Sequence, residues 1–139
     1  MASTRRSPIL YLVFVSAVLV TAVVHLRFVP DYFPDDPLRA TPVLVIGWIA
    51  FTVVFYAAGR LFATPGTLPS MRAADIGTAL FLVSLLAAGA LDAFGFTAQA
   101  VPEAYVLPGL GIYAGLALLG WSIGKRTTAI NRIAADRDR

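Results

Sequence analysis

The chain has 139 residues, of which 58% are hydrophobic and only 14% are charged, and its mean hydropathy is +0.77. A water-soluble domain carries about 25% charged residues, and so short a chain cannot bury this much apolar surface by folding in water. The composition therefore argues against a soluble domain and indicates a protein that lies in lipid.

Cysteine is absent and histidine occurs once. This excludes disulfides, thiol catalysis, thiolate zinc sites and iron–sulfur clusters, and it leaves too few imidazoles for most haem, copper or catalytic zinc sites. We therefore expect no metal and no cofactor. The net charge of +3 is explained by membrane topology, so we expect no binding to nucleic acid.

Four segments approach the roughly 20 apolar residues that cross a bilayer. They cover about residues 8–26, 42–63, 74–96 and 105–124. Pro8, Pro42 and Pro102 lie at or near the start of three of them, where the missing N–H suits a first helical turn. Short connections predict that consecutive spans are antiparallel neighbours. The predicted fold is an all-α, integral membrane four-helix bundle of one domain (1–139), in which residues 125–139 form a basic tail.

Lysine and arginine are distributed unequally between the two sides of these spans. Nine lie on one side: Arg5, Arg6, Arg60, Arg72, Lys125, Arg126, Arg132, Arg137 and Arg139. Two, Arg27 and Arg39, lie on the other. Because short cytoplasmic segments carry the excess of basic residues, both termini are predicted to be cytoplasmic. Ten arginines against one lysine are typical of a GC-rich genome, so we expect a multi-pass protein of a prokaryotic plasma membrane.

A signal peptide is the alternative interpretation of the first span. The stretch "STRRSPILYL" has a basic start followed by apolar residues, and its twin arginines resemble a twin-arginine export signal. The apolar run of about 18 residues exceeds a typical signal core. A retained span is therefore favoured over a cleaved one.

The stretch "VVHLRFVPDYFPDDP" at residues 23–37 holds the only histidine and three of the eight acidic residues. We interpret it as the exit of the first span from the membrane, with a belt of aromatic rings and with prolines that end the helix. The alternative is an outer polar cluster that binds a cation or a basic partner, or acts as a proton-sensitive latch. Its members would be His25, Asp92 and Glu103, with Asp35 and Asp36 above them. A simple His25–Asp92 pair is the favoured form of this cluster, and the spacing matches no metal motif.

Small residues in the last two spans predict close helix packing. Gly111 and Gly115 are four residues apart, as are Gly120 and Gly124, and Ser84 and Ala88 repeat this spacing in the third span. The polar residues near mid-span are also interpreted as packing elements: Ser16, Thr52, Tyr56, Thr78, Ser84 and Tyr113. The predicted cytoplasmic contacts with lipid headgroups come from four cations: Arg60, Arg72, Lys125 and Arg126.

Two dipeptides and the number of spans resemble features of a known family. Phe33-Pro34 in the outer connection and Gly95-Phe96 at the end of the third span are similar to the "FP" and "GF" of the small subunit of tripartite tricarboxylate transporters. The resemblance is confined to these features and assigns no site residue.

Three functions are compatible with these observations. The favoured one is a non-catalytic accessory or scaffold subunit of a larger membrane complex, with lipid and other membrane subunits, or a second copy, as partners. The alternative is a component of a small-solute or ion transporter or channel that acts as an oligomer. A membrane enzyme is the least favoured, because His25, Asp92 and Glu103 would be its only acid/base set.

Overall fold

All secondary structure in the described part of this computed structural model is helical. The structure describes residues 8–33, 35–64 and 68–137. The elements are α1 (Pro8–Val23), a π-helical turn (Val24–Phe28), α2 (Val29–Tyr32), α3 (Pro37–Leu61), α4 (Arg72–Ala93), a short 3-10 helix (Pro102–Tyr105) and α5 (Val106–Arg137). Several residues used in the sequence argument lie outside the described ranges: Arg5, Arg6, Pro34 and Arg139.

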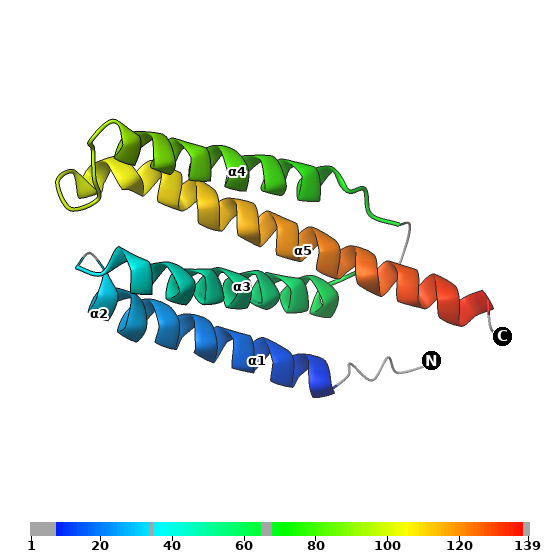
Figure 1. Ribbon diagram of the computed structural model, residues 1–139. Helices are drawn as coiled ribbons and strands as arrows, with labels where there is room; N and C mark the ends of the chain where they lie inside the picture. The colour runs from blue at the N-terminus through cyan, green and yellow to red at the C-terminus, as the bar shows by residue number, and fades with distance from the viewer. Residues whose placement is uncertain (1–7, 34, 65–67, 138–139) are drawn as a thin grey trace.

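Within the described ranges, four helical stretches are long and apolar enough to cross a membrane, as the sequence predicted: Pro8–Tyr32, Leu38–Leu61, Arg72–Ala93 and Pro102–Arg137. They alternate in direction, and their packing order is α1, α3, α5, α4. The central helices α3 and α5 therefore run parallel, while α1–α3 and α5–α4 are antiparallel hairpins (Figure 1). We call the end that carries Phe33, Asp35, Asp36 and residues 94–101 the distal end, and the opposite end the terminal end.

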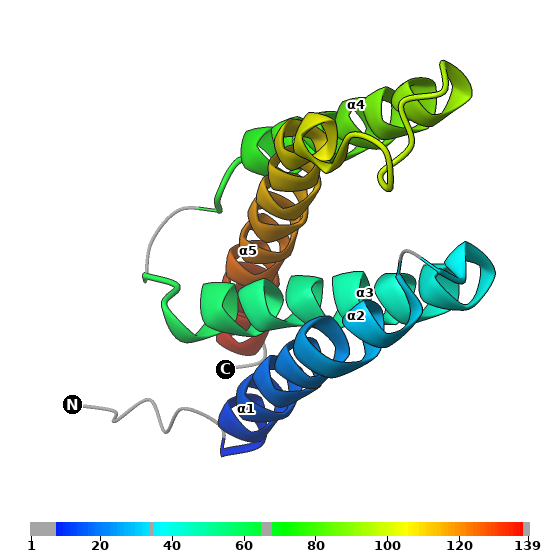
Figure 2. The same cartoon turned by 90° about the vertical axis from the view of Figure 1, so that its left-hand side faces the viewer.

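Consecutive spans are not all neighbours, in contrast to the sequence expectation. α4 packs mainly on α5 rather than on α3, and it meets α3 through the edge-to-face rings of Trp48 and Phe81, whose centroids are 5.8 Å apart. Figure 2 shows α5 between α3 and α4 over much of their length. α1 and α4 flank the row, and each has one main helical neighbour.

The first membrane-spanning stretch continues to Tyr32, six residues beyond its predicted end. The Val29 N–H donates to the carbonyl of Val24, five residues back, and this widened turn defines the π-helical segment. Pro30 then lies in the first turn of α2, where its missing N–H costs a single bond. Proline at this position therefore does not end the helix.

α3 begins at Pro37, before the predicted start at Pro42. The carboxylate of Asp36 accepts the backbone N–H of Arg39 at 3.2 Å and so caps the helix. Its second oxygen lies 3.2 Å from the Arg39 Nε. Pro42 lies inside the helix, close enough to its start that only one early carbonyl loses its partner.

Glycine positions the central pair of helices. A Cβ on Gly120 or Gly124 would overlap backbone carbonyls of α3, those of Thr52 and Tyr56. Gly115 faces α4 instead, where a Cβ would lie 2.6 Å from the carbonyl oxygen of Gly77. The backbones of α3 and α5 therefore touch in the terminal half of the row, and those of α4 and α5 touch near mid-length.

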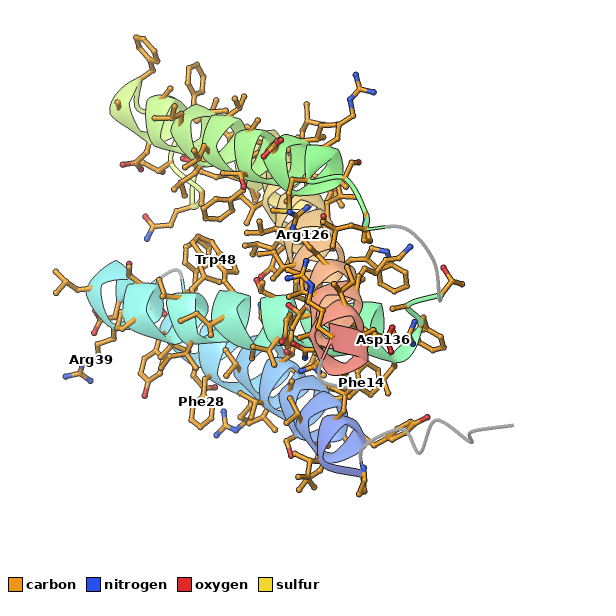
Figure 3. All side chains as sticks on the ribbon, turned by 90° about the vertical axis from the view of Figure 1, so that its right-hand side faces the viewer. Phe14, Phe28, Arg39, Trp48, Arg126 and Asp136 are labelled. Atoms are coloured by element: carbon orange, nitrogen blue, oxygen red, sulfur yellow. The ribbon has the colours of Figure 1, made fainter. Side chains whose placement is uncertain are left out.

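The two hairpins diverge from this glycine contact toward the distal end (Figure 2). Figure 3 shows Trp48 extending from α3 into the space between them, while Phe28 points away from it. α5 has 32 residues, about 48 Å at 1.5 Å per residue. This exceeds the hydrocarbon thickness of about 30 Å, so its last turns project beyond the other helices.

Candidate functional site

A hydrogen bond between His25 and Tyr113 links the two hairpins. The His25 Nε2 lies 2.5 Å from the Tyr113 hydroxyl, although their helices, α1 and α5, are not packed neighbours. The rings meet edge to face with centroids 5.4 Å apart. This contact is the polar connection from the first span to the fourth.

The contact made by the second ring nitrogen of His25 shows which nitrogen carries the proton. The His25 Nδ1 lies 2.8 Å from the carbonyl oxygen of Thr21, one turn earlier in α1. Because a carbonyl can only accept, Nδ1–H is the donor. In the neutral ring, Nε2 is then an acceptor and the Tyr113 O–H donates to it. Both nitrogens are satisfied without charge, which suits a residue about 10 Å inside the helix end at Tyr32.

Gly47 of α3 makes this contact possible. A Cβ at Gly47 would lie 2.6 Å from the His25 Cε1 and 2.8 Å from a methyl carbon of Val24. The imidazole therefore crosses α3 where that helix has no side chain. On the far side, the ring of Phe51 meets Tyr113 at 82° and 5.1 Å and holds the phenol in place.

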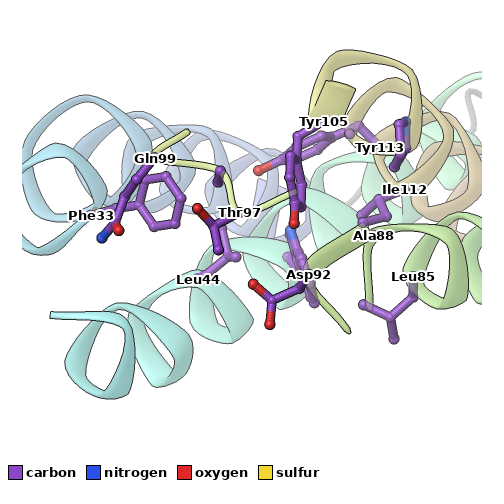
Figure 4. Close-up of a pocket in the computed structure, with 14 residues that line it drawn as sticks. Phe33, Leu44, Leu85, Ala88, Asp92, Thr97, Gln99, Tyr105, Ile112 and Tyr113 are labelled. Carbon is purple, nitrogen blue, oxygen red and sulfur yellow. The ribbon is translucent and has the colours of Figure 1, made fainter. Parts of the chain in front are cut away.

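A cavity of about 540 Å³ lies between the hairpins in the distal half of the molecule (Figure 4). Its volume is within the 300–1,000 Å³ range of ligand pockets, and most of its wall is apolar. The lining comes from α3, α4, α5 and the distal loops: Phe33, Leu44, Trp48, Leu85, Ala88, Asp92, Thr97, Ala98, Gln99, Tyr105, Pro108, Gly109, Ile112 and Tyr113. Tyr113 thus joins the hairpin link to the cavity.

The end of α4 positions the polar groups at the cavity mouth. Gly95 has a φ of +86°, and the N–H of Phe96 bonds back to the carbonyl of Leu91 at 2.9 Å. This turn stops the helix in the manner of a glycine C-cap and leads into Thr97 and Gln99, which line the cavity. The loop therefore places its polar side chains beside the last turn of α4.

Asp92 is the one carboxylic acid among the residues that line the cavity, and no lysine, arginine or histidine lines it. Its side chain is exposed and interacts electrostatically with the hydroxyl of Tyr105, which also lines the cavity. Within the described ranges, no ion pair engages Asp92. The mouth therefore has negative potential next to aromatic and aliphatic walls.

Trp48 contributes a buried polar atom to the same wall. Its indole Nε1 is shielded from solvent and makes no hydrogen bond to any described residue. The Tyr113 hydroxyl is the polar group near it, and their contact is looser than a regular hydrogen bond.

Among the described residues, no ion pair joins members of the outer polar cluster considered from the sequence. His25 bonds to Tyr113 and forms no ion pair with Asp92 among the residues described. Glu103 is exposed in the short 3-10 helix. Asp36 caps α3, and Asp35 is exposed beside it. Throughout the described residues, no three His or acidic side chains come together in a way that could hold a metal ion.

The residues predicted for packing occupy two different interfaces. Gly111 faces Ser84, whose Oγ lies where a Cβ would be, so this pair joins α5 to α4 with Gly115. Gly120 and Gly124 instead face α3. Ala88 lines the cavity.

The four predicted headgroup contacts lie at the terminal end. Arg126 donates to the carbonyl of Pro69 at 3.1 Å and so holds the α3–α4 connection. Arg60 lies over the ring of Tyr56, and the Lys125 Nζ over that of Trp121, each 5.8 Å from the centroid. Arg72 is exposed at the first residue of α4.

Sequence reasoning missed Gly47, Trp48 and the partnership of His25 with Tyr113. Tyr113 was interpreted as a packing residue, and its hydroxyl instead completes the link between the hairpins. The available signal was a histidine and a tyrosine in different apolar spans, because polar groups in lipid seek one another.

Comparisons with family models, with curated proteins and with solved structures find no match to this chain.

Proposed function

We propose that this chain is a non-catalytic integral membrane subunit that assembles with other membrane-spanning chains. The supporting observation is the open row of helices, in which α1 and α4 each pack on one main neighbour. Their outward faces carry large apolar side chains, among them Leu12 of α1 at 67% exposure and Leu86 of α4 at 73%. An additional transmembrane helix can pack on either flank without rearrangement of the row.

Photo-crosslinking tests this assembly. A photoreactive amino acid at Leu12 or Leu86 is expected to give discrete protein adducts in native membranes, whose mass distinguishes another subunit from a second copy. Ile49, 60% exposed on the central helix α3, provides the matched control and is expected to react with lipid. Lipid adducts alone at both flank positions, with no partner after gentle solubilisation, would refute the subunit role.

We propose the orientation with both termini in the cytoplasm of a prokaryotic cell. Among the described residues, six basic side chains belong to the terminal end: Arg60, Arg72, Lys125, Arg126, Arg132 and Arg137. Arg27 and Arg39 belong to the distal end, and each is paired with an aspartate. This asymmetry follows the positive-inside rule.

Single cysteines test the orientation directly, because the chain has no cysteine of its own. Ala100→Cys in the distal loop is expected to react with a membrane-impermeant maleimide in intact cells. Ser70→Cys, before α4, is expected to react only after permeabilisation. The two positions are both exposed, so the reverse pattern would invert the proposed topology.

A component of a small-solute transporter or channel remains the second candidate, and the cavity between the hairpins favours it. Purified protein in liposomes would then release a trapped ion or small solute faster than empty liposomes. Equal release rates for all tested solutes would eliminate autonomous transport.

A further inference from the structure

The distal cavity combines three features that favour one class of ligand. Its walls are apolar, four of its lining residues are aromatic, and its mouth carries a carboxylate. The aromatic residues are Phe33, Trp48, Tyr105 and Tyr113. We propose that the cavity binds an amphiphilic cation, with the hydrocarbon body between the hairpins and the cationic head beside Asp92. Such binding is independent of whether the chain is a subunit or a transporter.

The charged groups around the cavity favour a cationic ligand over an anionic one. No lysine or arginine lines the cavity. The two arginines of the distal end are engaged elsewhere, Arg27 with Asp31 and Arg39 with Asp36. An anionic headgroup at the mouth would therefore meet the Asp92 carboxylate without a compensating cation, and like charges repel.

The aromatic lining adds a second source of attraction. An ammonium group over the face of a tyrosine or tryptophan is attracted by the negative face of the ring. Tyr105 lies next to Asp92 at the mouth, so the carboxylate and the ring act at the same place. A neutral headgroup gains neither attraction.

Apolar side chains deeper in the cavity would surround the hydrocarbon body of the ligand. Leu44, Leu85 and Ile112 line it from three different helices. Trp48 lies on the α3 wall, and its indole ring faces Phe81 across the gap. An alkyl chain inserted here replaces contacts with lipid tails by contacts with fixed side chains, while its head stays at the polar mouth.

Tryptophan quenching provides the test, because the chain has two tryptophans and one of them lines the cavity. A Trp121→Phe variant leaves Trp48 as the sole reporter. The probes are alkyl chains of one length with a terminal bromine, which quenches on contact, and with a trimethylammonium, hydroxyl or carboxylate head. The protein is held in zwitterionic lipid nanodiscs so that the bilayer surface contributes no net charge.

The trimethylammonium probe is expected to quench Trp48 with an affinity about tenfold above that of the hydroxyl probe, and the carboxylate probe is expected to be weakest. Asp92→Asn removes the carboxylate and should reduce the ratio of the trimethylammonium affinity to the hydroxyl affinity from about tenfold to the few-fold that the aromatic rings alone supply. The affinity for the hydroxyl probe should be unchanged. Asp75→Asn is the matched control, because Asp75 lies in the first turn of the same helix at the opposite end. It should retain the full preference.

A Trp48→Phe variant, which reports from Trp121, corrects for simple partitioning of the probes into the bilayer. Non-brominated alkyltrimethylammonium should restore Trp48 fluorescence by competition. Equal affinities for the three heads, an unaltered preference in Asp92→Asn, or equal quenching of Trp48 and Trp121 would each overturn the assignment. Circular dichroism of every variant confirms that a lost preference reflects the removed group rather than unfolding.

Discussion

Replacing Gly124 by alanine is expected to lower the free energy of unfolding by about 1–3 kcal/mol, the usual cost of overpacking a tight contact. The new Cβ would overlap the carbonyl oxygen of Tyr56 and lie 3.1 Å from the Arg60 nitrogen. Both are backbone atoms, so no side-chain rotation relieves the clash and α3 must move away from α5. Denaturant-induced unfolding in mixed micelles, followed by circular dichroism, measures the change.

Gly89→Ala is the matched control for this substitution. Gly89 lies within α4, and a Cβ there would have nothing within 4 Å. Alanine in place of an unconstrained helical glycine stabilises by about 0.5–1 kcal/mol. The two Gly→Ala variants should therefore shift in opposite directions. A Gly124→Ala protein as stable as the wild type would mean that the central helices are not in backbone contact.

Replacing Tyr113 by phenylalanine is expected to cost about 1–2 kcal/mol, because the His25 Nε2 then loses its donor while it stays inside the protein. A double-mutant cycle with His25→Ala should give a coupling between about 0.6 and 1.7 kcal/mol, the average and the maximum found for hydrogen bonds between membrane helices. The same unfolding assay applies to all three variants.

Tyr32→Phe provides the comparison for the loss of a phenol oxygen. The Tyr32 hydroxyl, at the end of α2, makes no hydrogen bond to another described residue. We expect its removal to change stability by less than about 0.5 kcal/mol. Additive effects of the His25 and Tyr113 substitutions would show that the hairpins are joined by apolar contact alone.

The sequence was sufficient for the fold class because lipid imposes a simple rule. A helix must satisfy its own backbone, so four apolar runs of spanning length predict four helices. Among the residues that the structure describes, all secondary structure is helical and four stretches are long and apolar enough to span a membrane.

The limits of the helices are harder to predict, because the sequence interpretation takes Pro30 as the end of one helix and Pro42 as the start of the next. Pro30 and Pro42 both lie within helical stretches. At Pro30 the helix changes to a π-helical turn just before it, and at Pro42 the residue is near enough to the start to cost little. Hydropathy alone does not distinguish these positions from a true helix end.

The cavity and its hairpin link depend on packing order, which hydropathy does not encode. The pattern of apolar runs is equally compatible with α4 packing on α3 or on α5. The role of Gly47 follows from the packing order, because the His25 ring crosses α3 to reach α5 at the position where Gly47 has no side chain. The same dependence explains why Tyr113 looked like an ordinary packing residue in the sequence.

The backbones of α3 and α5 meet at Gly120 and Gly124, so the two hairpins are held close together at this point. Gly124 lies 11 residues beyond Tyr113 along α5, so the lever arm from this point to the cavity is about 16 Å. A rotation of one hairpin about this point would displace its distal end along that arm and would change the width of the cavity. Substitutions at Gly120 or Gly124 that shift the contact would therefore alter the cavity without touching its lining.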